Sequence, residues 1–124
     1  MRTFDDTILV PLNAICRKDP IHFVGLGAYD FQLSFGDINR IMTKEKAVFS
    51  LRGTVYSWEE GPADIPVWLL IGQTPERFEL GSPLALRLCL DSGDYVEFHT
   101  TEEPFEAVII DFGGQDGALV MEIY

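Results

Sequence analysis

The chain has 124 residues, of which 47% are hydrophobic, and a formal net charge of −11 at pH 7. This is enough for one domain, residues 1–124, whose hydrophobic core needs no disulfide. Only nine Lys and Arg residues accompany 20 Asp and Glu residues. Binding to nucleic acid or to an anionic membrane is therefore not expected, because both need positive charge.

The first half of the sequence predicts mostly strands. Leu12–Arg17 is a candidate for a short helix. From Tyr29 to Phe35 apolar and polar side chains alternate, which is typical of a half-buried strand. Gly36-Asp37 predicts a turn after it. Ala47–Trp58 is expected to be one strand, bent at Gly53, since glycine inside a strand often marks a bulge.

The second half predicts a loop, an ambiguous apolar segment and four strands. The loop is Glu59–Pro66, and Pro66–Ile71 fits either a short helix or a buried strand. In Leu84–Leu90 every second residue is leucine, so the leucines are expected to face inward and Arg87 outward. The other expected strands are Tyr95–Thr100, Phe105–Ile110 and Ala118–Tyr124.

Short strands separated by Gly, Asp and Pro turns predict a mainly β fold with one or two short helices. The expected architecture is an antiparallel sandwich or a partly open barrel. The sequence also contains an internal similarity between "GAYDFQLSFGDINRI" and "GSPLALRLCLDSGDYVEF". Each stretch has a glycine, an alternating strand, a Gly-Asp turn and a return strand. Each is followed by another strand, Ala47–Leu51 or Phe105–Ile110, which indicates two related three-stranded meanders packed together.

Few residues indicate catalysis or metal binding. Cys16 and Cys89 lie far apart without zinc-ligand spacing, and Cys89 is expected to be a small buried hydrophobe. His22 and His99 also lack ligand spacing. The Asp91–Asp94 segment suits a hairpin turn better than a calcium loop. We therefore expect no catalytic residue, no metal and no cofactor, and an enzyme is the less favoured class.

The acidic residues are the candidate binding site. Residues 63–124 contain two Lys and Arg residues and twelve Asp and Glu residues, so this half would attract a basic protein partner. An aromatic side chain beside acids suits a protein contact, although both tryptophans of "SWEEGPADIPVW" can equally cap the core beside a solvated loop. The candidate partner-binding residues are Trp58, Glu59, Glu60, Asp64, Glu97, Glu102, Glu103 and Glu106.

The segment "LLIGQTPERFELGSPLALRLCLDSGDYVEFHTTEEPFEAVII", from Leu69 to Ile110, resembles a pattern of small uncharacterised bacterial domains. The shared features are a Gly-Gln pair, an alternating strand, an Asp-x-Gly turn, a return strand and a strand that starts with Phe-Glu-Ala. The resemblance implies a β-rich fold. Some proteins of this kind resemble immunity proteins that neutralise secreted toxins, which implies a non-catalytic inhibitor. The resemblance implies no catalytic residue.

Two other functions stay open at this point. One is a small-molecule-binding β-barrel or an enzyme, which would need a pocket into which acids and a histidine converge. The other is a structural subunit whose exposed strands form a homodimer. Asp5 and Asp6 do not suit a signal peptide, and the longest apolar runs are too short to span a bilayer. A cytoplasmic location is therefore expected.

Overall fold

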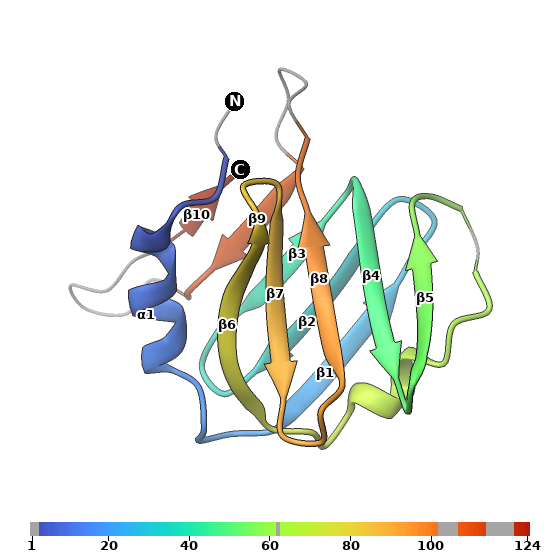
Figure 1. Ribbon diagram of the computed structural model, residues 1–124, viewed down its shortest axis with the longest axis horizontal. Helices are drawn as coiled ribbons and strands as arrows, with labels where there is room; N and C mark the ends of the chain where they lie inside the picture. Colours follow the sequence, from blue (N-terminus) through green and yellow to red (C-terminus); the bar gives the residue numbers. More distant parts are fainter. Residues whose placement is uncertain (1–2, 62, 102–106, 114–120) are drawn as a thin grey trace.

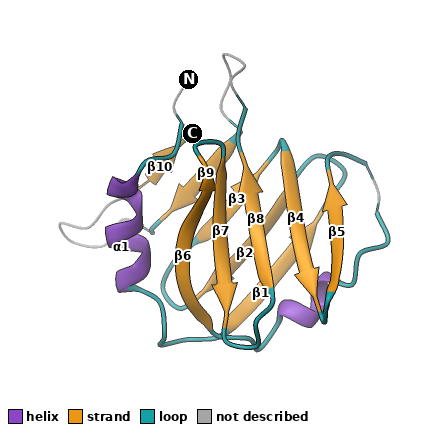
Figure 2. Ribbon diagram, in the orientation of Figure 1, coloured by secondary structure: helices purple, strands orange, loops and turns teal. Residues whose placement is uncertain are grey.

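The computed structural model describes residues 3–61, 63–101, 107–113 and 121–124, and these form a β-sandwich of two antiparallel sheets (Figures 1 and 2). The first sheet contains, in spatial order, β1 (Ile21–Leu26), β2 (Phe31–Phe35), β3 (Arg40–Thr43), β9 (Val108–Asp111) and β10 (Met121–Ile123). The second contains β5 (Thr54–Trp58), β4 (Lys46–Leu51), β8 (Tyr95–His99), β7 (Ala85–Leu90) and β6 (Pro75–Ser82). The predicted mainly β sandwich is confirmed, and the sheets do not close into a barrel.

The two halves of the chain repeat one topology. Strands β1, β2 and β3 form one meander, and strands β6, β7 and β8 form the other. Each meander is followed by two strands that join the opposite sheet: β4 pairs with β8, and β9 pairs with β3. The two expected hairpins are present, but the third strand expected for each meander is wrong: Ala47–Leu51 and Phe105–Ile110 were expected to continue the meanders, whereas β4 and β9 join the opposite sheet and β1 and β6 complete the meanders. The structure adds that each half of the chain completes the sheet of the other half.

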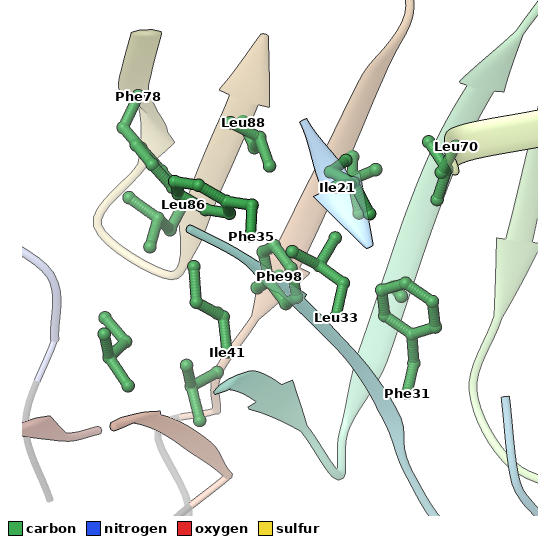
Figure 3. Close-up of a cluster of buried hydrophobic side chains, with 14 of the residues drawn as sticks. Ile21, Phe31, Leu33, Phe35, Ile41, Leu70, Phe78, Leu86, Leu88 and Phe98 are labelled. Atoms are coloured by element: carbon green, nitrogen blue, oxygen red, sulfur yellow. The ribbon is translucent and has the colours of Figure 1, made fainter. Parts of the chain in front are cut away.

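The core lies between the two sheets, where the alternating apolar residues meet (Figure 3). The Phe31 ring contacts Phe49 and Phe98, with centroid distances of 4.8 Å and 5.9 Å. Leu86 and Leu88 of β7 are fully buried, as the period-two pattern predicts. Burial of this apolar surface is the main term that stabilises the sandwich.

Short helices close the two open sides of the sandwich. On one side, η1 (Asp6–Ile8) and α1 (Leu9–Ala14) lie beside β6, and Leu12 is buried (Figure 1). On the other side, η2 (Val67–Leu70) lies beside β1 and buries Leu70. No helix in the described residues is long and apolar enough to cross a membrane.

Three predictions about local structure are wrong. Ala47–Trp58 is a hairpin and not one bent strand, because Arg52 and Gly53 both have positive φ, 52° and 85°, and form a two-residue turn. Arg-Gly is a weaker turn signal than Asn-Gly or Asp-Gly, so this turn could not be predicted from the sequence. Tyr29 is exposed and precedes the strand that it was expected to start. The first helix begins at Leu9, three residues before its predicted start.

Candidate partner-binding site

Four charged residues meet at one end of the second sheet. Lys44 and Glu45 form the turn before β4, and Glu59 and Glu60 follow β5 directly. Because β4 and β5 are antiparallel and Ala47 pairs with Trp58, the start of β4 and the end of β5 lie at the same end of the sandwich. These four residues line an open hollow of about 260 Å³, which we call the acidic hollow.

The charged side chains of the acidic hollow are free of ion pairs and hydrogen bonds within the described residues. Lys44, Glu59 and Glu60 are exposed and Glu45 is half-buried. In the part of the chain that the structure describes, none of their side chains forms a hydrogen bond or an ion pair. Three carboxylates and one ammonium group leave a local excess of negative charge, which is suited to a Lys or Arg side chain of a partner.

Trp58 does not contribute its side chain to this surface. It is 2% exposed, and its indole Nε1 donates a hydrogen bond to the carbonyl oxygen of Gly61 over 2.9 Å. The expected contact role of Trp58 is therefore corrected: the indole caps the core and anchors the loop after β5. Trp68 is 63% exposed on η2. Asp64 is exposed too, but it does not line the acidic hollow.

Glu97 also differs from the expectation of a free surface charge. Its side chain lies on the outer face of the second sheet and is only 12% exposed. Arg87 donates to Glu97 Oε2 from Nε over 2.9 Å and from Nη2 over 2.6 Å, and His99 Nε2 lies 3.1 Å from Oε1. The guanidinium of Arg87 also stacks 4.3 Å from the centre of the Tyr95 ring. Glu97 is thus the centre of a polar cluster, and not a contact residue.

The neighbours of Glu97 favour its ionised form. Burial would by itself raise the pKa of Glu97, but hydrogen bonds from Arg87 and His99, together with the charge of Arg87, outweigh burial and lower that pKa below 4.5. The carboxylate therefore stays ionised at neutral pH, and a general acid would need the opposite shift. Glu102, Glu103 and Glu106, the remaining candidates, lie outside the described residues.

The Asp91–Asp94 segment is built into the fold. Asp94 is buried and accepts hydrogen bonds from the Arg52 backbone N–H over 2.9 Å and from Gln73 Nε2 over 3.0 Å. Asp91 accepts one from the Thr74 backbone N–H over 3.3 Å. These bonds connect the β7–β8 turn to two neighbouring turns. Within the described ranges, no group of three or more His, Cys, Asp or Glu residues is placed to hold a metal ion.

An open depression of about 500 Å³ lies on the outer face of β6 and β7. Four of its charged groups pair with one another: Arg77 with Glu76 and Glu79, at 3.0 Å and 3.4 Å, and Arg87 with Glu79 at 3.7 Å. A ligand would therefore have to compete with existing ion pairs, so this surface is less suited to binding than the acidic hollow.

The two cysteine thiols are free and buried. Burial raises the pKa of Cys16 to about 11, against a lowering effect of Arg17. Burial and the charge of Glu79 raise the pKa of Cys89.

Because the thiolate is the reactive form, we expect the native Cys16 thiol to react with a disulfide reagent at pH 8 at least ~100-fold more slowly than in urea. The variants Cys16→Ser and Cys89→Ser show which thiol gives which reaction rate. A native Cys16 thiol that reacts as fast as in the unfolded chain would contradict its burial.

No family model, no curated protein and no solved structure matches this chain. The described residues define its class on their own, as a two-sheet antiparallel β-sandwich with exchanged strand pairs and an acidic hollow at one end. The resemblance to bacterial immunity-type domains remains a prediction. Lys44 and Glu45 were not predicted as site residues, because only the pairing of β4 with β5 brings them next to Glu59 and Glu60.

Proposed function

We propose that this chain is a non-catalytic interaction protein of the immunity or inhibitor type, which binds a basic protein partner at the acidic hollow. The observation that carries the proposal is the gathering of Glu45, Glu59 and Glu60 around one Lys44 without an ion pair among the described residues. Two other acids have structural contacts instead. Asp94 accepts hydrogen bonds from the Arg52 backbone N–H and from Gln73, and Glu97 forms an ion pair with Arg87.

The overall charge supports the same kind of partner. A chain with a net charge of −11 attracts a basic protein over long distances and increases the rate of encounter. Carboxylates at an exposed rim act mainly on this rate and on orientation, and they lose strength as salt increases. The complex is therefore expected to be strongly salt-dependent.

The test is a binding titration with one defined probe, the purified product of a basic, toxin-like gene adjacent to the gene of this protein. Calorimetry at about 0.05 M NaCl should show a one-to-one complex, and the affinity should fall at least about tenfold at about 0.5 M NaCl, where the Debye length is a few ångströms. Absence of binding at the lower salt concentration would contradict the proposal, and so would an affinity that salt does not change.

A further inference from the structure

Strand β5 is an open edge of the second sheet among the described strands. The edge of β6 is covered by α1, since Asn13 bonds both the N–H and the carbonyl of Phe78, at 2.7 Å and 3.3 Å. The edge of β1 is tied at its first residue, where Ile21 accepts a hydrogen bond from Gly72 N–H and donates one to the Gln73 carbonyl, and a register shift between Ile21 and Phe23 interrupts the strand. Strand β10 has only three residues.

Strand β5 also lacks the usual protection of an exposed edge. Its sequence, "TVYSW", contains no charge, no proline and no glycine, and Val55 is 61% exposed. Natural proteins block such edges with lysine, proline or a bulge, because unpaired backbone groups bind another strand. Among the described strands, β4 is the one neighbour of β5.

The hairpin turn determines which backbone groups of β5 are free. In a two-residue hairpin the pair that closes the turn, here Leu51 and Thr54, exchanges two hydrogen bonds. Bonding then alternates along the strand, so Thr54, Tyr56 and Trp58 bond to β4. The N–H and carbonyl groups of Val55 and Ser57 point away from β4, and no hydrogen bond to them occurs from elsewhere in the described chain.

These outward groups match a second copy of the same strand. In an antiparallel pair centred on Tyr56, Val55 of one copy exchanges hydrogen bonds with Ser57 of the other. The same register places Arg52, which is exposed and without a side-chain ion pair in the described residues, opposite Glu60 of the other copy. The charges, the free hydrogen-bonding groups and two-fold symmetry therefore all fit the register centred on Tyr56.

We propose that β5 forms an antiparallel β5–β5 contact between two copies of this chain, which joins their second sheets into one continuous sheet. The net charge of −11 on each copy opposes the contact. This repulsion acts over long distances and is largely screened at about 0.15 M salt, whereas the backbone hydrogen bonds and the Arg52–Glu60 pair are short-range. Dimerisation should therefore strengthen when salt is raised from low to physiological concentration.

Sedimentation velocity between about 5 and 500 μM at about 0.15 M NaCl tests the proposal. The wild type should pass from monomer to dimer in this range. Ser57→Pro removes an outward N–H without touching the β4 ladder, so it should raise the dimer dissociation constant at least about tenfold while circular dichroism shows an unchanged fold. Val55→Lys should do the same, and the matched variant Val10→Lys, at a residue 74% exposed on α1, should not.

Charge reversal tests the register separately. Arg52→Glu should weaken the dimer, and the double variant Arg52→Glu with Glu60→Arg should restore it, because the pair is then reversed and not lost. A chain that stays monomeric throughout the concentration range would overturn the proposal. A dimer unaffected by Ser57→Pro and Val55→Lys would overturn it too. Neither of these two β5 variants touches the acidic hollow, so their result is independent of the proposed partner-binding function.

Discussion

Replacing Trp58 by Ala is expected to lower the free energy of unfolding by about 3–5 kcal/mol, the largest effect of any substitution considered in this protein. The indole is 2% exposed, so its removal leaves a cavity at the end of the core. It also removes the hydrogen bond to the Gly61 carbonyl oxygen, which leads into the loop after β5. Urea denaturation followed by far-ultraviolet circular dichroism measures the loss.

Two further variants separate the core role of Trp58 from a contact role. Trp68→Ala removes an indole that is 63% exposed and should change stability by no more than about 0.5 kcal/mol. Trp58→Phe should cost about 1–2 kcal/mol, mainly for the lost hydrogen bond, and should leave binding of the basic probe unchanged. Equal losses for Trp58→Ala and Trp68→Ala would show that the indole of Trp58 is not buried.

Replacing Glu97 by Gln should lower the free energy of unfolding by about 2–3 kcal/mol at pH 7. The neutral amide could not balance the charge of Arg87, which donates two hydrogen bonds to Oε2, and it would lose the charge-assisted contact with His99. The matched control is Glu76→Gln. Glu76 also pairs with an arginine, Arg77, but both side chains are exposed, so the expected loss is below about 0.5 kcal/mol.

The stabilisation by Glu97 should depend on pH in a defined direction. Its pKa is lower in the folded protein than the ordinary 4.5. The folded state therefore favours the ionised form, and the stabilisation is fully present above pH 4.5 and is lost as the pH falls through the folded-state value. The difference in unfolding free energy between wild type and Glu97→Gln should shrink as the pH falls below 4.5. A difference that grows on acidification would contradict the ion pair.

The alternating pattern of the strands predicts most of the fold because its cause is local. Leu86, Leu88 and Leu90 face the core for the same reason that any period-two apolar run does. Three features escaped this reasoning, one of which is strand β6 (Pro75–Ser82). The Arg52-Gly53 turn carries a weak local signal, and β1 mixes apolar residues with an exposed His22 at the sheet edge.

The candidate site is less predictable, because it depends on which strands become neighbours. Glu97 looks like a solvated acid in the sequence, yet the β7–β8 register places Arg87 directly across from it. In contrast, Glu45 belongs to the acidic hollow only because β4 returns beside β5. Net charge indicates only that a basic partner would be favoured, whereas strand pairing decides which carboxylates stay free of ion pairs.

Partner binding is expected to depend on the position of the carboxylates and not on the total charge. Two triple variants test it, each of which raises the formal charge from −11 to −8. One neutralises the acidic hollow through Glu45→Gln, Glu59→Gln and Glu60→Gln. The other neutralises exposed carboxylates elsewhere through Asp6→Asn, Asp37→Asn and Glu76→Gln.

The deciding measurement is the dissociation constant of each triple variant with the same basic probe at about 0.05 M NaCl. The affinity should fall at least about tenfold for the acidic-hollow variant and no more than about threefold for the variant with acids neutralised elsewhere. Equal losses for the two variants would contradict this expectation, since binding would then follow net charge alone.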